Sequence, residues 1–166
     1  PIYLTIRSAD KSTTKVYEIR PTVHKVDPDL YTWTQLTSQI YPEDDSDQKA
    51  LELGNAFVLI KSNGFKMRAY RSLDGSAWTD LGEPTGLPTG TQVRQMISDG
   101  AKLYYGQGNT IYASSDAITW TAQTVSYPVI TMLLYWNNRV WALVENGGYE
   151  LAYIENNDLT LGGGRL

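Results

Sequence analysis

The sequence predicts an all-β protein, and three observations support this prediction. Short apolar segments rich in β-branched and aromatic residues recur along the chain, for example at residues 56–61 and 139–145. Turn-forming pairs such as Gly54-Asn55 and Asn137-Asn138 separate these segments. No stretch of the sequence has the apolar period of a helix.

The composition is that of a globular chain with a mildly acidic surface. Of the 166 residues, 42% are hydrophobic and 19% are charged, and the formal net charge is -4. A negative surface does not attract phosphate backbones, so we expect no nucleic-acid partner. The chain has no cysteine, which excludes disulfides and thiolate metal sites. It also has no apolar run long enough to cross a membrane, so we expect no transmembrane segment.

The first 27 residues predict an element of their own. Residues 2–6 and 15–19 alternate apolar and polar side chains and are joined by a polar segment, as in an antiparallel strand pair. We interpret residues 1–27 as the tail of a β-sandwich-like domain or as linker strands. Because the chain begins at Pro1 without an initiator methionine, we expect it to be a processed or trimmed piece.

From about residue 28 onward, a turn motif recurs in which an Asp precedes a Trp by four residues. Its copies are Asp29 with Trp33, Asp74 with Trp78, and Asp116 with Trp120. Successive aspartates are 45 and 42 residues apart, which is typical of the four-stranded blades of a β-propeller. A further interval of 42 residues leads to Asp158, which we interpret as a degenerate copy without its Trp.

Each repeat is expected to contain a hairpin followed by the Asp-bearing turn. We expect first strands at residues 49–53, 93–98 and 129–136, second strands at 56–61, 102–106 and 139–145, third strands at 66–71, 110–114 and 149–154, and fourth strands at 78–81 and 120–124. Chain reversals at Asn63-Gly64, Gly108-Asn109 and Asn146-Gly147 would join the second strands to the third.

The count of strands predicts an incomplete propeller of about three blades over residues 28–166. Residues 33–36 resemble a lone fourth strand, and the third repeat is expected to lack its fourth strand because the sequence Gly-Gly-Gly-Arg-Leu stands in its place at residues 162–166. Closed propellers have four to eight blades. We therefore expect either a missing remainder of the propeller or self-association with other copies.

The recurring turns resemble the Asp-box of sialidases and related propellers of the BNR-repeat type, in which Ser-x-Asp, a Gly and a Trp recur once per blade. Ser72, Asp74, Gly75 and Trp78 carry the resemblance, although this turn is one residue shorter than the usual box. The order of parts is also similar to a family of secreted gut-bacterial proteins of unassigned function, in which a small β-domain precedes a sialidase-like propeller. This resemblance implies a location outside the cytoplasm, in the periplasm or at the cell surface.

The recurring aspartates and tryptophans are predicted to be structural. An Asp before a turn accepts backbone N–H groups and fixes the reversal, and a catalytic carboxylate would not be needed in every blade. The tryptophans are interpreted as packing residues between strands.

One aromatic group is the candidate ligand surface, because flat rings stack on the apolar faces of sugars. Its members are Tyr104, Tyr105, Tyr135, Trp136 and Trp141. For any one of these rings, the alternative is a place in the core between blades.

We find no catalytic constellation, and we expect no cofactor and no metal. The acidic segment 43–47 lacks the glycine and final glutamate of a standard calcium loop, and His24 is the only histidine. A sialidase needs an arginine cluster, but none of the available arginines falls in a motif of that family. These are Arg68, Arg71, Arg94 and Arg139.

The leading hypothesis is a noncatalytic module that binds or scaffolds, with a glycan or a cell-surface protein as partner. One alternative is a fragment of a sialidase-like glycoside hydrolase whose catalytic residues lie outside this piece. A second alternative is a purely structural module that assembles with its own copies.

Overall fold

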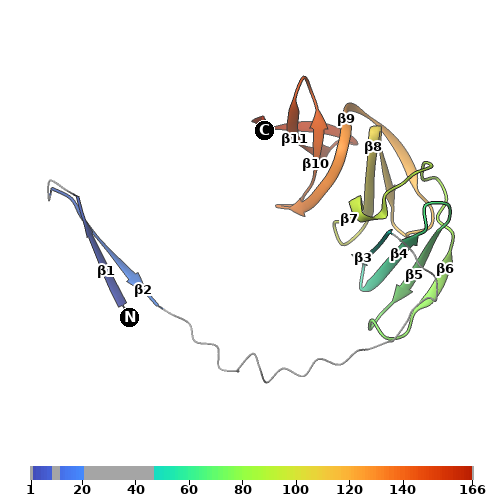
Figure 1. The fold of residues 1–166 in the computed structure, drawn as a ribbon, viewed down its shortest axis with the longest axis horizontal. Coiled ribbons are helices and arrows are strands. Elements are labelled where there is room, and N and C mark those ends of the chain that lie inside the picture. Colours follow the sequence, from blue (N-terminus) through green and yellow to red (C-terminus); the bar gives the residue numbers. More distant parts are fainter. Residues whose placement is uncertain (1, 9–11, 21–46, 166) are drawn as a thin grey trace. The chain divides into compact units, whose positions relative to one another are not determined.

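The computed structural model describes residues 2–8, 12–20 and 47–165. The predicted turn from Asp29 to Trp33, the lone strand at 33–36 and residues 43–46 of the acidic segment lie outside these ranges. The described residues form an all-β structure, as the sequence predicts (Figure 1). Its one helical element among the described residues is the single 3-10 turn η2, Val93–Gln95.

The N-terminal strands form a hairpin. β1 (Ile2–Arg7) pairs antiparallel with β2 (Thr14–Ile19), in a register that runs from Ile2 opposite Ile19 to Arg7 opposite Thr14. Ser8 N donates to Thr13 O at 3.0 Å and closes the connection. The predicted antiparallel pair is confirmed, and the assignment of residues 1–27 to a separate domain stays a prediction.

A separate four-stranded antiparallel sheet follows in the order of the sequence (Figure 1). Its strands are β3 (Asp47–Leu53), β4 (Ala56–Ser62), β5 (Met67–Ser72) and β6 (Thr79–Gly82). This is the blade that the first complete repeat predicts. β4 is the most buried strand, because apolar side chains on both of its faces are covered.

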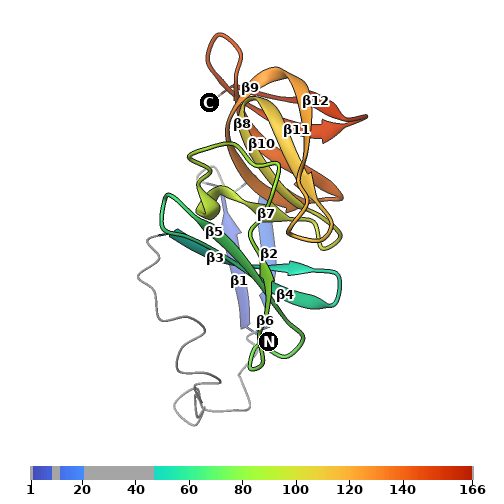
Figure 2. The same cartoon turned by 90° about the vertical axis from the view of Figure 1, so that its right-hand side faces the viewer.

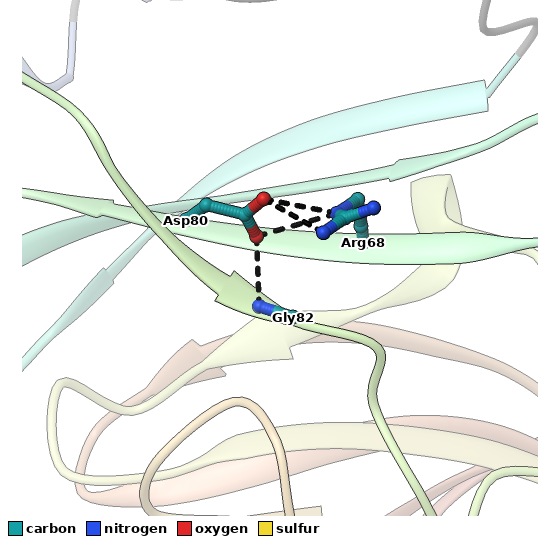
Figure 3. Close-up of polar contacts among 3 residues, drawn as sticks. All are labelled: Arg68, Asp80 and Gly82. Atoms are coloured by element: carbon teal, nitrogen blue, oxygen red, sulfur yellow. Dashed lines mark hydrogen bonds and ion pairs between the residues drawn. The ribbon is translucent and has the colours of Figure 1, made fainter.

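The pairing of β5 with β6 shifts register between Ala69 and Tyr70. Ala69 pairs with Gly82 and Tyr70 with Asp80, which leaves Leu81 as an extra residue on β6. The Arg68 Nη2 group forms an ion pair with Asp80 Oδ2 at 2.9 Å, and Asp80 Oδ1 accepts the Gly82 N–H at 2.8 Å (Figure 3). Asp80 therefore satisfies a backbone donor beside the bulge and connects the two strands through their side chains.

The remaining strands form one six-stranded antiparallel sheet rather than two separate blades. Its order is β12-β11-β10-β9-β8-β7. The strands are β7 (Ile97–Ser98), β8 (Leu103–Ser114), β9 (Thr121–Trp136), β10 (Arg139–Glu145), β11 (Tyr149–Glu155) and β12 (Asp158–Arg165). Figure 2 shows how strongly this sheet curls.

The predicted chain reversal at Gly108-Asn109 is wrong, because β8 runs through this point as one strand of 12 residues. Gly108 pairs with Val129, and the register shifts between Gly108 and Thr110. A Cβ atom on Gly106 would lie 2.5 Å from Val129 Cγ1, so glycine allows β9 to cross closely there. The glycines of this segment thus serve a bulge and a close crossing instead of a turn.

The predicted boundary between residues 124 and 129 is also absent, since β9 continues for 16 residues from one predicted blade into the next. Ser126 N and Ser126 Oγ both donate to the Asp158 carboxylate, at 2.8 and 2.5 Å. Residues 125–128 of β9 lie where its pairing with β8 shifts register, and Pro128 among them has no N–H group to leave unpaired. The strand therefore bends here without ending.

Two further strand predictions need correction. Residues 93–95 form η2 and not the start of a strand, because the Asp47 carboxylate accepts the N–H groups of Val93 at 2.6 Å and Arg94 at 3.1 Å. The third repeat does have its fourth strand, β12, which pairs with β11. Asn156 and Asn157, both with positive φ, make the two-residue turn between them.

Two hydrophobic cores lie on opposite faces of β8. The first core packs Ile60 of the four-stranded sheet against Met96 and Leu103, and all three side chains are fully buried. Each contributes roughly 1.5 to 3 kcal/mol by its removal from water. The second core lies inside the curl of the six-stranded sheet and includes Met132 and Val144.

Candidate functional site

The two described Asp–Trp turns have nearly identical hydrogen bonds. In the first, Asp74 Oδ1 accepts the N–H groups of Ser76 at 2.8 Å and Ala77 at 3.0 Å. The Trp78 indole N–H donates to Gly75 O at 3.0 Å. The carboxylate and the indole thus form their hydrogen bonds within the turn itself. They stabilise the chain reversal and do not serve as ligand-binding groups.

The second turn repeats this arrangement. Asp116 Oδ1 accepts the N–H groups of Ile118 at 2.8 Å and Thr119 at 2.7 Å, and the Trp120 indole donates to Ala117 O at 3.2 Å. Ser114 Oγ donates to the Asp116 carboxylate at 2.9 Å, as Ser72 Oγ donates to that of Asp74 at 3.1 Å in the first turn.

Hydrogen bonds lower the pKa of both carboxyl groups. For Asp74 the largest cause is the Ala77 N–H, followed by the N–H of Ser76. For Asp116 burial acts to raise the pKa, but the N–H groups of Thr119 and Ile118 and the hydroxyl of Ser114 together outweigh it. Both groups are therefore held as anions, which suits acceptors and does not suit proton donors.

Asp158 makes different contacts from the other two aspartates. It is the first residue of β12, and its carboxylate accepts from Ser126 N, Ser126 Oγ and Leu159 N. The Ser126 hydroxyl is the largest cause of its lowered pKa. Asp158 thus connects the start of β12 to the bend of β9.

The five aromatic residues predicted as a candidate ligand surface do not lie on one face in the structure. Tyr104 and Tyr105 are neighbours on β8 and point to opposite faces, Tyr104 against the second core and Tyr105 into the first. Tyr105 is buried, and its hydroxyl donates to Gln107 Oε1 at 3.2 Å. Burial raises the pKa of Tyr104, as does the hydrogen bond that its hydroxyl donates to Asp99 Oδ2 at 2.8 Å.

The other three rings are divided by the strand register. Trp141 pairs with Leu134, whereas its neighbour Val140 pairs with Tyr135. Because side chains opposite each other in a register share a face, Trp141 and Leu134 lie on the outer face of the sheet, and Tyr135 lies on the face of the second core. The Tyr135 hydroxyl donates to Asn138 Oδ1 at 3.2 Å.

An outer apolar surface, which we define as Leu133, Leu134, Trp136, Trp141 and Leu151, surrounds a hollow of about 380 Å³. Trp136 retains 64% of its exposure to solvent. A Cβ atom on Gly162 would lie 2.7 Å from Trp141 Cζ3, so the glycine makes room for the indole against β12.

Two residues that the sequence analysis did not place in the site border this surface. The Tyr153 ring lies 5.2 Å from the Trp141 ring, centroid to centroid, at an interplanar angle of 58°. The Arg139 guanidinium carbon lies 3.9 Å from the centroid of Tyr153, a cation–π contact. The alternation of β10 and β11 could have indicated both, since Arg139, Trp141 and Tyr153 share a face.

Three of the four candidate arginines have local partners. Arg68 pairs with Asp80, Arg139 covers Tyr153, and Arg94 Nη2 donates to Gln92 Oε1 at 3.0 Å. Arg71 is exposed and lines a hollow with Asp74 and Leu81. Across residues 2–8, 12–20 and 47–165, no helix is long and apolar enough to span a bilayer.

A four-stranded antiparallel sheet that packs through a hydrophobic core on a second antiparallel sheet, with an Asp–Trp turn between two strands of each, defines a domain of the β-propeller class. A family model described as the DUF6242 beta propeller domain matches residues 27–161, which is well over half of the chain, and the chain belongs to this family. No curated protein and no solved structure matches the chain significantly. The family description names a fold and no activity.

Proposed function

We propose that the chain is a noncatalytic binding and scaffolding module, active outside the cytoplasm, that docks a partner protein on its outer apolar surface. One observation carries the proposal. The hollow on this face is lined only by leucine and tryptophan side chains, and Leu134 and Trp136 are 49% and 64% exposed. Exposed apolar surfaces of this kind are typical of protein interaction sites.

The way in which the sheets already pack indicates what the partner presents. The inner face of β10 is buried in the second core through Val140, Ala142 and Val144. The four-stranded sheet packs on β8 in the same face-to-face manner through the first core. The outer face of β9–β11 continues this stack, so a polypeptide with aliphatic and aromatic side chains on a sheet face is the complementary partner.

A glycan is supported less well at this place. Trp136 offers an exposed ring for stacking, but no hydroxyl, amide or carboxylate is among the side chains that line the hollow. Sugar recognition needs such groups to bond hydroxyls. The hydrolase fragment remains an alternative that depends on residues outside this chain.

Site-specific photo-crosslinking in the cells that make the protein tests the docking proposal. A photoreactive phenylalanine analogue at position 136 should crosslink a protein, while the same analogue at position 57, an exposed Phe on β4, should not. The purified partner should then lose about tenfold or more in affinity for Leu134→Glu. Equal crosslinking at both positions would contradict the proposal, and crosslinking to identical chains alone would favour the self-assembling module.

A further inference from the structure

A second concave site lies at one end of the four-stranded sheet. The β4–β5 turn and the loop that follows β6 border an open hollow of about 240 Å³, which we call the cavity. Its lining includes Phe65 and Lys66 from the turn and Glu83, Pro84 and Thr89 from the loop. None of these residues belongs to the outer apolar surface, so the site does not depend on the proposed docking function.

The turn holds Phe65 in an unusual position. Asn63 Oδ1 accepts the N–H groups of Phe65 at 3.0 Å and Lys66 at 2.8 Å, and Ser62 Oγ accepts the Gly64 N–H at 3.1 Å. These bonds fix the backbone of the turn. The Phe65 side chain is nevertheless 97% exposed, so this ring contributes almost nothing to the core.

The opposite wall is also fixed before any ligand arrives. Pro84 and Pro88 restrict the backbone, and Thr91 Oγ1 donates to Pro88 O at 2.7 Å. Thr85 N donates to Ile118 O at 2.7 Å, which attaches the loop to the second Asp–Trp turn. A cavity whose two walls are already ordered loses little conformational entropy on binding.

The side chains in the cavity combine an apolar ring with unpaired polar groups. Lys66 and Glu83 are exposed, and neither side chain makes a hydrogen bond or ion pair with the part of the chain that the structure describes. An ammonium group donates hydrogen bonds and a carboxylate accepts them, while Thr89 can do both. One positive and one negative charge leave the cavity without net charge.

We propose that this cavity binds a small neutral carbohydrate. The C–H face of a pyranose would stack on the Phe65 ring, Glu83 would accept hydrogen bonds from hydroxyl groups, and Lys66 would donate to hydroxyl oxygens. An anionic ligand would be repelled by Glu83 and a cationic ligand by Lys66, and a purely apolar ligand would desolvate both charges without replacing their hydrogen bonds. A neutral polyol with one apolar face satisfies all three groups.

Amide-resolved NMR titration of the whole chain tests this proposal. The probes are methyl glucoside, methyl galactoside, methyl mannoside and N-acetylglucosamine, with the zwitterion serine as a comparison, each to about 50 mM so that millimolar Kd values are measurable. At least one sugar should shift the amides of residues 62–67 and 83–91. No shift with any sugar, shifts confined to residues 133–141, or shifts with serine alone would overturn the assignment.

Three variants sharpen the test. Phe65→Ala should lower the affinity for the sugar about 2- to 10-fold, because the stacking contact is lost. Glu83→Gln should lower the affinity by about tenfold or more, because a charged acceptor is lost. Phe57→Ala, which removes the other phenylalanine of the chain at a site outside the cavity, should leave the affinity unchanged. The amide spectrum shows in the same measurement that each variant is folded. Equal affinities for the wild type, Phe65→Ala and Glu83→Gln would overturn the proposal.

Discussion

The two Asp–Trp turns have the same internal hydrogen bonds but different surroundings. The turn around Trp78 lies on the surface, and its indole is partly exposed, whereas Trp120 is 4% exposed and belongs to the first core. Trp120 N also donates to Thr85 O at 3.0 Å, which attaches the second turn to the loop after β6. The motif therefore specifies a local chain reversal, while its contribution to stability depends on which residues cover it.

Removal of each indole should give the clearest difference in stability between the two turns. Trp120→Ala should lower the free energy of unfolding by about 3 to 5 kcal/mol, because it leaves a cavity in the first core. Trp78→Ala should cost clearly less, since this ring is only partly buried. Denaturant titrations of both variants measure the difference, and equal losses would show that the turns are covered to the same extent.

Gly86 tests the close contact that covers the second turn. A Cβ atom at this position would lie 2.1 Å from Trp120 O, and the glycine has a φ of +85°. We expect Gly86→Ala to destabilise by about 2 to 4 kcal/mol from crowding and from backbone strain together. Gly90→Ala is the control, because its φ of +78° carries similar strain but no atom lies within 4 Å of the added Cβ. A control as unstable as Gly86→Ala would remove the contact from the explanation.

The residue with positive φ in each turn offers a smaller contrast. Gly75 has a φ of +76° in the exposed turn, and Ala117 has a φ of +69° in the buried turn. Gly75→Ala should cost about 1 kcal/mol of stability through left-handed strain. Ala117→Gly should change stability by less than about 0.5 kcal/mol, because relief of the same strain is offset by loss of a buried methyl group. Thermal unfolding of both variants checks that Gly75→Ala destabilises the protein and that Ala117→Gly leaves its stability nearly unchanged.

The smallest difference is expected in acid, where the internal hydrogen bonds alone matter. The pKa of Asp74 and that of Asp116 are both lowered in the folded protein, so each contributes stability that is present above the unfolded pKa of about 3.9 and is lost as the pH falls through the folded value. Asp74→Asn and Asp116→Asn should each flatten the loss of stability below about pH 4. Urea midpoints measured from about pH 6 to pH 2.5 test this, and an unchanged slope in both variants would contradict it.

The sequence predicted the elements that local chemistry determines. The turns at Gly54-Asn55 and Asn137-Asn138 lie where expected, because positive φ at Gly54, Asn137 and Asn138 is encoded by the residue itself. The strands from β3 to β6 follow the repeat for the same reason. Apolar alternation and turn residues act within a few positions of each other, so a single sequence is enough to read them.

The corrections concern places where a distant partner decides the structure. Gly108-Asn109 has the residues of a turn, but the strand continues because β9 pairs alongside it. Residues 93–95 have the pattern of a strand, but the Asp47 carboxylate, 46 positions before Val93, accepts the N–H groups of Val93 and Arg94. Alternation along β8 separates Tyr104 from Tyr105, and the pairing of β10 with β9 places Tyr135 on the inner face and Trp141 on the outer face.

The unbroken course of β9 has a consequence for how the domain opens. Its first half pairs with β8 and its second half with β10, and no loop separates the two. The second and third repeats therefore share the strand β9 and one sheet, and they should exchange their amide hydrogens as a single cooperative unit. The four-stranded sheet, which is joined to this unit by side-chain packing and a few polar contacts, is the part that can open by itself, so subglobal unfolding should begin at β3–β6.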